Sequence, residues 1–326
     1  MDLITQGLLG ATVGYAVSGK TLGNRKSVKY GALFGALPDL DILFDFVSNH
    51  PLAQIIYHRG ITHSLFFAPI MAFFIGFFVQ YKKRGSFRDW FYLSFWAILT
   101  HPILDLFTTY GTQLLQPISN HRFALNAVSI VDPLYSIPLL ISILVIWYSK
   151  NRIFSSLFNS VTLFLTTCYL LLGVAQYDEA LKRVIDEGKK HQWKGHCEVF
   201  SGLFSIFERR AVFYDGDYVH IANFSNIKKD SIQWVTFKQV ECSVTSAEIE
   251  IFKWFSSGHI LIQKNERGYL LRDIRFGIYP HPMDGLWGIE VDEKGNYLGW
   301  ERFASIRTEG MKNVKEILDK IQDFKF

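Results

Sequence analysis

Acidic residues are scarce in the first half of this 326-residue chain. Residues 1–175 contain no glutamate and only seven aspartates, so 23 of the 30 acidic residues lie in residues 176–326. Apolar residues make up 49% of the sequence, and the mean hydropathy of +0.13 is high for a soluble protein. The chain therefore divides into an apolar first half and a second half of ordinary soluble composition.

Cysteine is also scarce, and the motifs of several enzyme classes are missing. Of the three cysteines, Cys197 and Cys242 could form a disulfide only in an oxidising compartment. The sequence has no G-x-S-x-G elbow and no Walker loop, and Cys168 has no acid–base partner nearby. Nucleophilic catalysis by serine or cysteine is therefore unsupported. The net charge is only +4, and we expect no nucleic-acid partner.

Long apolar runs fill the first half instead. A helix needs about 20 mostly apolar residues to span a bilayer. The clearest candidates are Ser64–Tyr81, Trp90–Phe107, Pro133–Tyr148 and Ile153–Ala175, and the weaker ones are Ile4–Ser18 and Tyr30–Val47. The weaker two could span the bilayer or form re-entrant helices packed inside the bundle. The fold class predicted for this half is an all-α membrane helical bundle of about six segments.

The connections between these runs differ strongly in basic charge. Ten lysines and arginines occupy the connections at 20–29, 82–88 and 150–152. Before residue 176, the other connections carry only Arg59 and Arg122. If six segments span, the basic connections share one side of the membrane, and that side should be cytoplasmic. The other connections and the second half should then lie outside the cytoplasm.

The second half has the patterns of a mixed α+β domain. Short β-patterned runs occur at Ala211–Tyr214, Tyr218–Phe224, His259–Gln263, Tyr269–Phe276 and Leu286–Val291. Helices are predicted at Tyr177–Lys190, Ser246–Ser256 and Met311–Gln322. We expect a membrane-embedded helical domain carrying a metal site at 1–175, and an extracytoplasmic α+β domain of unknown role at 176–326.

Three polar clusters interrupt the apolar half. They are Pro38-Asp39-Leu40-Asp41 with Asp45, the run His58-Arg59-Gly60-Ile61-Thr62-His63-Ser64, and His101-Pro102-Ile103-Leu104-Asp105. An ionised side chain inside a bilayer costs a few kcal/mol, so it persists where it is paired, faces water or binds an ion. The clusters therefore favour a common function.

The spacing within each cluster is suited to metal binding. On a helix, His101 and Asp105 are four residues apart and share a face. His58 and His63 flank a turn that contains a glycine, just before an apolar helix. In an extended stretch, Asp39 and Asp41 would share a face. Mixed imidazole and carboxylate ligands suit zinc, with manganese or iron(II) as alternatives, better than calcium.

The predicted topology is consistent with a shared site. All three clusters fall at the non-cytoplasmic ends of their segments, although the charge argument used none of their aspartates and histidines. The six candidate metal ligands are Asp39, Asp41, His58, His63, His101 and Asp105. Six ligands are enough for one ion or for two ions that share a bridging water.

Simpler interpretations remain open for several of these residues. Asp45 could be a helix cap or a hydrogen-bonded buried group, and Asp132 before Pro133 is expected to cap the following helix. Arg59 could be a membrane-interface anchor or could hold an anionic oxygen such as phosphate. Arg122 has the same ambiguity. Asp39 and Asp41 could instead bind a monovalent ion or relay protons in a transporter. The scattered histidines of the second half are expected to be ordinary surface or core residues: His191, His196, His220, His259 and His281.

Hydrolysis is the reaction that a His/Asp metal site supports best, because the ion lowers the pKa of water and polarises the substrate oxygen. A phosphoester or a related ester is the expected substrate. Since the site lies near the headgroups, that substrate could be a membrane lipid or could be lipid-linked. Two alternatives remain: an ion- or proton-coupled transporter, and a scaffold in which the metal is structural.

The combined motifs resemble those of a known family. Asp-Leu-Asp after a proline, His-Arg-Gly-x-Thr-His-Ser and His-Pro-x-Leu-Asp resemble the membrane-bound metal-dependent hydrolases of bacteria, also described as LexA-binding inner-membrane hydrolases. The His-x-x-x-Asp pair is similar to one in zinc-dependent phospholipase C. The resemblance covers about residues 1–150.

The resemblance implies a bacterial inner-membrane location and the six ligand positions named above. It also implies supporting, catalytic roles for Arg59, Thr62 and Asp132. Many members carry a histidine after the threonine of the first helix, whereas this chain has Gln6. Because glutamine is a poor zinc ligand, one ligand is missing or replaced.

Overall fold

A computed structural model describes residues 1–228, 230–277 and 287–301. The predicted helix Met311–Gln322 and His281 lie outside these residues. The chain forms two compact units. The first contains Met1–Ala180 and Leu203–Glu208, and the second contains Leu181–Gly202 and the residues from Arg209 onward.

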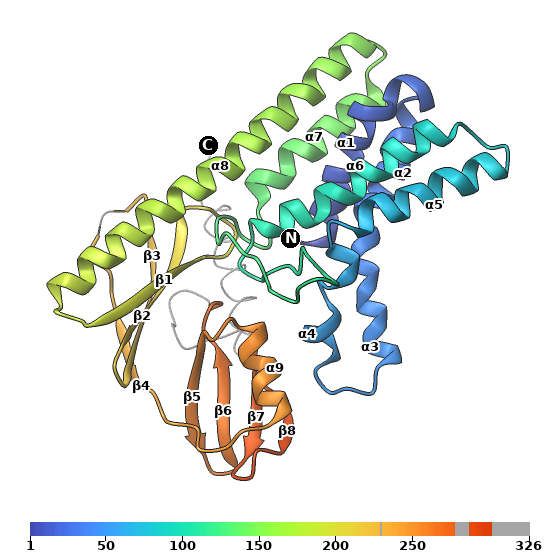
Figure 1. The fold of residues 1–326 in the computed structure, drawn as a ribbon. Coiled ribbons are helices and arrows are strands. Elements are labelled where there is room, and N and C mark those ends of the chain that lie inside the picture. The colour runs from blue at the N-terminus through green and yellow to red at the C-terminus, as the bar shows by residue number, and fades with distance from the viewer. Residues whose placement is uncertain (229, 278–286, 302–326) are drawn as a thin grey trace, which may run out of the picture. The chain divides into compact units, whose positions relative to one another are not determined.

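The first unit is helical (Figure 1). Its elements in order are α1 (Leu3–Leu22), α2 (Asn24–Gly35), the 3-10 helix η1 (Leu37–Leu43), α3 (Phe44–Val47), α4 (Ala53–Tyr57), the 3-10 helix η2 (Ile61–His63), α5 (Phe67–Tyr81), α6 (Phe87–Leu106), α7 (Pro133–Tyr148) and α8 (Arg152–Lys190). Asp2 caps α1 by accepting a hydrogen bond from the backbone of Thr5. Pro133 takes the first position of α7, where its missing N–H costs nothing.

The helices overlap the expected apolar runs, but few of them are long enough to cross a bilayer. Among the described residues, α8 is the one helix long and apolar enough to cross a bilayer by length and composition. A second span results if Ala53–His63 and Phe67–Tyr81, which meet at a 64° bend, are counted together. With 15 and 16 residues, α5 and α7 fall short of a full crossing. Six crossings therefore remain a prediction.

Two of the expected segments have different boundaries in the structure. The expected segment Tyr30–Val47 is broken, because α2 ends at Gly35 and the 3-10 helix η1, which has Pro38 as its second residue, follows it. The expected helices Ile153–Ala175 and Tyr177–Lys190 are one continuous helix, α8, since no proline or glycine cap separates them. The compact first unit accordingly extends five residues beyond 175.

Glycines let α1 and α2 approach closely. A Cβ atom on Gly31 would lie 2.4 Å from the carbonyl oxygen of Gly10, and one on Gly10 would lie 2.4 Å from that of Gly31. A Cβ atom on Gly35 would lie 2.7 Å from the carbonyl oxygen of Gln6. The two backbones can therefore touch only because these residues lack side chains.

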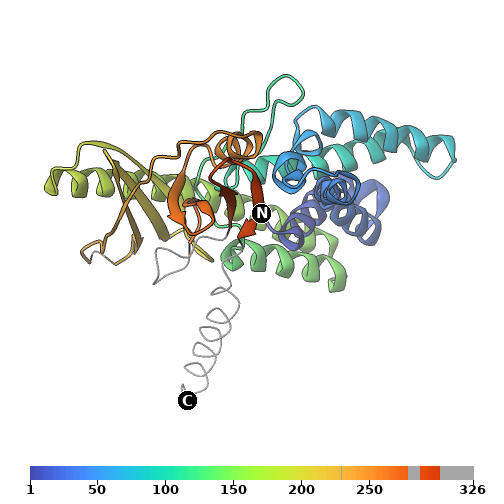
Figure 2. The same ribbon diagram turned by 90° about the horizontal axis from the view of Figure 1, so that it is seen from below.

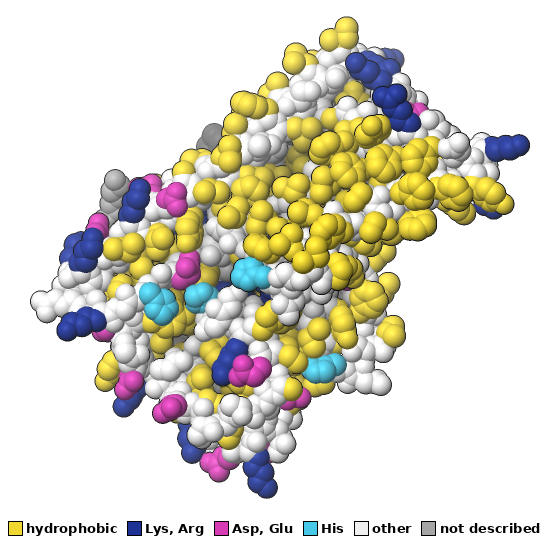
Figure 3. Space-filling model, viewed as in Figure 1, with side chains coloured by type: hydrophobic (Ala, Val, Ile, Leu, Met, Phe, Trp, Pro, Cys, Tyr) yellow, Lys and Arg dark blue, Asp and Glu magenta, His cyan; other side chains and the backbone are white. Residues whose placement is uncertain are grey.

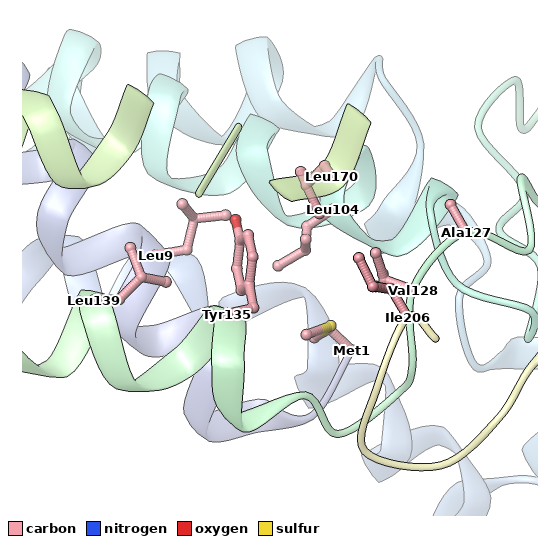
Figure 4. Packing of buried hydrophobic residues seen from close by; sticks show 9 residues of the cluster. All are labelled: Met1, Leu9, Leu104, Ala127, Val128, Tyr135, Leu139, Leu170 and Ile206. Atoms are coloured by element: carbon pink, nitrogen blue, oxygen red, sulfur yellow. The ribbon is translucent and has the colours of Figure 1, made fainter. Parts of the chain in front are cut away.

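The core of the first unit lies between four helices (Figure 4). Tyr135 and Leu139 of α7 pack with Leu9 of α1, Leu104 of α6 and Leu170 of α8, and each is less than a tenth exposed. A second cluster joins α2, α5 and α6 through residues that include Phe34, Ala68 and Leu93. These clusters fix α6, which carries two of the candidate ligands, against its neighbours.

The connection from residue 107 to 132 crosses one end of the helices without a regular element (green in Figures 1 and 2). It forms an isolated bridge between Thr112 and Phe123. The amide of Gln113 donates to the carbonyl of Arg59 at 3.0 Å, and the amide of Leu65 donates to that of Leu114 at 3.0 Å. This connection therefore holds the His58–His63 segment in place.

The second unit contains two four-stranded antiparallel sheets, with strand orders β1-β2-β3-β4 and β5-β6-β7-β8. The strands are β1 (Gly195–Ser201), β2 (Glu208–Asp215), β3 (Tyr218–Ser225), β4 (Val235–Lys238), β5 (Ile260–Asn265), β6 (Gly268–Asp273), β7 (Gly288–Asp292) and β8 (Tyr297–Glu301). Helix α9 (Ala247–Phe255) is capped by Ser246. In the first sheet, Val199 pairs with Ala211.

The α+β composition expected for the second half is confirmed. Each of the five expected strands overlaps an observed one, whereas β1, β4 and β8 were not expected. Strand β4 has only four residues, none of them buried, so it carries little hydrophobic pattern. The suggested disulfide does not form, because Cys197 on β1 and Cys242 before α9 are both free thiols.

Candidate metal centre

The candidate ligands reach one point from three separate elements of the first unit. Asp39 lies on η1, His63 ends η2, and His101 and Asp105 lie on α6. On α6 the four-residue spacing places both side chains on one face, as expected, and both are fully buried. His101 Nε2 lies 3.5 Å from Asp105 Oδ2.

Four nitrogen and oxygen atoms converge there. Asp39 Oδ1 lies 3.4 Å from His63 Nε2 and 3.3 Å from His101 Nε2. His63 Nε2 lies 3.4 Å from Asp105 Oδ2. The ligand atoms of Asp39, His63 and His101 are all within 4.8 Å of one another. Imidazoles and carboxylates from separate elements therefore lie close together, as expected, and a shared cation among them remains a prediction.

The unsatisfied atoms of this cluster test whether a metal fits. His63 Nε2, His101 Nε2 and Asp105 Oδ2 are buried and have no hydrogen-bond partner. Buried polar atoms are rarely left in this condition, so three together need a reason. Tetrahedral zinc ligands at about 2.1 Å from the ion stand about 3.4 Å apart. The observed separations of 3.3–3.5 Å between the histidine nitrogens and the carboxylate oxygens match that spacing. The group whose ligand atoms are all mutually close consists of Asp39, His63 and His101, and Asp105 adjoins it through the two histidines.

The other nitrogen of each ring is already bound. His101 Nδ1 lies 2.6 Å from the carbonyl oxygen of Gly35, to which it can only donate. His63 Nδ1 lies 3.2 Å from Asp41 Oδ2 and 3.0 Å from Thr62 Oγ1. Donation from Nδ1 leaves the lone pair of Nε2 directed at the cluster. Both rings are therefore held in the tautomer that binds metal.

Asp41 holds the whole His58–His63 segment. Its Oδ1 accepts a hydrogen bond from His58 Nδ1 at 2.8 Å. Its Oδ2 accepts from the amide of Arg59 at 2.9 Å, from Thr62 Oγ1 at 3.0 Å, and faces His63 Nδ1. Asp41 is 2% exposed. A carboxylate can accept about four hydrogen bonds, so these four donors occupy all the acceptor positions of Asp41.

The two carboxylate oxygens of Asp105 contact different groups. Oδ1 lies 3.1 Å from Arg59 Nη2, accepts from Gln6 Nε2 at 3.0 Å, and contacts the amino group of Met1. Oδ2 faces the two histidines. Arg59 is itself fixed, since its Nη1 donates to Thr108 Oγ1 at 2.8 Å. The cations keep this buried carboxylate ionised and orient its other oxygen toward the cluster.

Gln6 occupies the position where the resemblance implies a histidine. Its side chain is 1% exposed, and its amide nitrogen donates to Asp105 Oδ1 and, at 3.3 Å, to the carbonyl of His101. Its Oε1 is buried and has no partner. Gln6 therefore contacts the ligands as a hydrogen-bond donor.

The structure places the three residues expected to support catalysis differently. Arg59 and Thr62 adjoin the cluster through Asp105 and Asp41. Asp132 caps α7, as expected, by accepting from the amide of Leu134, and both its oxygens accept from Tyr169 Oη. Burial raises the pKa of the Asp132 carboxyl, and the Tyr169 hydroxyl opposes that rise. Catalytic roles for these residues remain predictions.

A second group of ligand atoms adjoins the first. Asp39, Asp41 and His58 also have atoms within 4.8 Å of one another. His58 is about a quarter exposed, so this side of the cluster is the more open one. Asp39 belongs to both groups and could bridge two ions. The ligand roles of Asp41 and His58 remain predictions.

Several supporting residues carried no recognisable sequence signal. The carbonyl of Gly35 is backbone, so no motif reveals it. Tyr110 lies beneath the guanidinium groups of both Arg59, at 4.7 Å, and Arg122, at 5.2 Å. Arg122 also donates to the carbonyls of His58 and Gly111. It therefore braces the loop that carries the histidines.

The histidines of the second unit have ordinary partners. His220 stacks on Trp193 with ring centroids 3.8 Å apart, and its Nδ1 bonds Thr236 Oγ1. His259 Nδ1 bonds Tyr214 Oη at 2.8 Å. Among the described residues, the possible metal-binding groups lie only in the first unit.

Comparisons with known proteins match the helical unit. A family model described as YdjM inner membrane protein matches residues 1–180. Inner membrane protein YbcI of Escherichia coli (strain K12) is 32% identical over 126 residues, which cover 37% of this chain and 70% of the relative. The uncharacterized protein YfhP of Bacillus subtilis (strain 168) is 28% identical over 159 residues, or 46% of this chain and 47% of the relative. No solved structure gives a significant match.

Proposed function

The chain belongs to the YdjM inner membrane protein family, and on that premise we propose that it is a membrane-bound metal-dependent hydrolase. Its substrate would be a phosphoester or a related ester. The observation that carries the proposal is the cluster of buried, unpartnered ligand atoms: His63 Nε2, His101 Nε2 and Asp105 Oδ2 around Asp39 Oδ1. The resemblance to LexA-binding metal-dependent hydrolases belongs to the same proposal.

Asp39, His63, His101 and Asp105 would hold the first ion. Two imidazoles and two carboxylates suit zinc, with manganese or iron(II) as alternatives. A metal at this position supplies Lewis acidity and lowers the pKa of water to near 7. Asp39, which is about one-sixth exposed, is the ligand nearest the open side and would face the substrate.

The surrounding residues would act by orientation. Asp41 holds His63 and the loop before it, while Arg59 and Gln6 hold Asp105. The terminal nitrogens of Arg59 contact Asp105 and Thr108, so Arg59 would keep Asp105 oriented toward the metal. Thr62 donates to Asp41 and would keep that carboxylate aligned.

The proposal extends to topology and substrate source. The family places the chain in the bacterial inner membrane. We infer that about six segments enter the bilayer, with the basic connections in the cytoplasm and the second unit outside it. A site at the non-cytoplasmic ends of the segments lies close to the headgroups, which favours a membrane lipid or a lipid-linked substrate. A topology reporter fused after Ala175 should therefore give a non-cytoplasmic signal.

Elemental analysis tests the site first. We expect the full chain, purified in mild detergent, to contain at least one equivalent of zinc or a related metal. His101→Ala and Asp39→Ala should each lose most of it. His121→Ala is the matched control, because His121 is exposed and lies outside the cluster. A low metal content that does not fall further in the two ligand variants would end the proposal.

Activity is tested next with phosphomonoesters, phosphodiesters, carboxylic esters and the lipids of the host membrane. Hydrolysis that disappears with His101→Ala in a folded protein supports an enzyme. Unfolding of the same variant would instead point to a structural metal. Ion flux in liposomes that Asp41→Asn abolishes, without any hydrolysis, would favour a transporter.

A further inference from the structure

A groove lies between α2, α5 and the beginning of α6, away from the metal centre. Its volume is about 650 Å³, within the range of ligand pockets. Aromatic rings dominate its wall: Tyr30 and Phe34 from α2, Phe74 and Phe78 from α5, and Trp90 from α6. The lining is therefore mainly hydrocarbon.

Three cations surround this apolar wall. Lys26, Lys82 and Arg84 line the groove, and their side chains are exposed. Within the described part of the chain, none of them forms an ion pair. Lys82 Nζ lies 5.7 Å from the ring centroids of Phe78 and Tyr81. Three uncompensated positive charges on an aromatic groove favour a ligand with both an anionic head and an apolar body.

Trp90 forms a rigid part of the groove wall. Trp90 is 8% exposed, and its indole Nε1 is buried without a hydrogen-bond partner. The ring is fixed by edge contacts with Tyr30, at 4.6 Å between centroids, and with Phe34, at 6.4 Å. Gly85 covers the indole nitrogen, since a Cβ atom on Gly85 would lie 2.6 Å from it, so Trp90 contributes its ring to the groove.

We propose that this groove binds an anionic phospholipid of the inner membrane. The phosphate would lie among Lys26, Lys82 and Arg84. An acyl chain would follow Phe74 and Phe78, whose side chains are 58% and 59% exposed. A soluble phosphate would leave these rings uncovered, and a zwitterionic headgroup would bring its own cation to the positive rim.

The position of the groove agrees with this occupant. Figure 3 shows hydrophobic side chains over the helices of the first unit and Lys and Arg side chains at their far ends. By the charge bias these ends face the cytoplasm, where anionic lipids attract basic residues. Trp90 precedes His101 by eleven residues, or about 17 Å along α6, so the lipid site is separate from the metal centre.

Native mass spectrometry of the full chain tests the proposal. The detergent-solubilised protein is titrated with phosphatidylglycerol or with phosphatidylcholine carrying the same acyl chains. We expect one phosphatidylglycerol to bind at least about tenfold more tightly than phosphatidylcholine. The triple variant Lys26→Gln/Lys82→Gln/Arg84→Gln should lose that preference.

The matched control changes the same net charge outside the groove: Lys83→Gln/Arg88→Gln/Lys150→Gln. It should keep the preference for phosphatidylglycerol. Equal binding of the two lipids by the native chain would overturn the proposal, and so would an equal loss in both triple variants. Full displacement of phosphatidylglycerol by inorganic phosphate would also overturn it, because the groove would then serve a soluble anion. A shared size-exclusion profile confirms that the variants are folded.

Discussion

At the level of single residues, Asp41 and Asp105 have the same side chain and different environments. Asp105 leaves one oxygen unpartnered, whereas both oxygens of Asp41 accept bonds from the His58–His63 segment. The simplest assignment is that Asp105 binds the metal and that Asp41 orients His63. Outer carboxylates of this kind set the ring orientation of a metal-binding histidine.

Substitution of Asp41 by asparagine separates these roles. The substituted amide would keep the size of the side chain but lose the charge that accepts from His63 Nδ1. We expect Asp41→Asn to bind zinc about 10–100-fold more weakly than the native chain, in a folded protein, as measured by competition with a chelating dye. Asp45→Asn is the control, since Asp45 is close in sequence but outside both ligand groups. Unchanged zinc affinity in Asp41→Asn would contradict the orienting role.

His259 predicts a pH dependence in the second unit. Burial, with a smaller contribution from Arg275, lowers the pKa of His259 to about 4. The unfolded chain has the ordinary value near 6.5 and therefore binds a proton first as the pH falls. The free energy of unfolding is therefore at its full value above pH 6.5 and decreases progressively as the pH falls toward 4. One pKa unit corresponds to about 1.4 kcal/mol, so the loss approaches about 3 kcal/mol.

This dependence is measured from the unfolding midpoint of the full chain between pH 4 and 7. His259→Gln should flatten the slope, because glutamine has no proton to take up. His191→Gln, at an exposed histidine, should keep the native slope. Identical profiles for the native chain and His259→Gln would show that other groups control acid stability.

At the level of elements, the contact between α1 and α2 bears on the metal centre. Gly31 packs on the backbone of Gly10, and Gly35 of the same helix supplies the carbonyl that orients His101. The close approach of the two helices therefore determines where that carbonyl lies.

Adding one methyl group tests this dependence. Gly31→Ala would place a Cβ atom 2.4 Å from the Gly10 oxygen, which forces the helices apart. We expect it to lower the free energy of unfolding by about 1–3 kcal/mol and to weaken zinc binding. Gly7→Ala is the control on the same contact, because its Cβ would lie at an ordinary 3.8 Å from the Ala32 oxygen. If both variants matched the native chain, the helices would not need their glycines.

At the level of the whole molecule, a metal that binds only the folded first unit should stabilise that unit. A ligand at a hundred times its dissociation constant adds about 2.7 kcal/mol. We therefore expect a chelator to lower the unfolding temperature of the native chain by several degrees. Differential scanning fluorimetry in detergent, with and without chelator and with zinc restored, measures the shift.

His101→Ala provides the control for this measurement. Without the His101 ligand, the chelator should shift its unfolding temperature little, and added zinc should not restore the native value. An equal chelator shift in both proteins would mean that the stabilising ion binds elsewhere.

The division of the molecule also follows from its charge distribution. An acid-poor first half became a helical unit, and an ordinary second half became two antiparallel sheets with one helix between them. The prediction of two halves rests on the composition of many residues, so an error in the position of one boundary does not change it. The exact limits did not follow, because α8 continues through residue 175 without a local signal to stop it.

The sequence by itself determined the helical and α+β halves and the ligand-bearing clusters. Apolar periodicity and ionisable residues within apolar runs are local properties, so Asp39, His63, His101 and Asp105 could be singled out without a fold. Only the tertiary structure decided which atom of each residue faces the shared point. Gly35 and His101 are 66 positions apart, and Gln6 and Asp105 are 99 apart. Such contacts depend on how closely the helices approach, which no local pattern encodes.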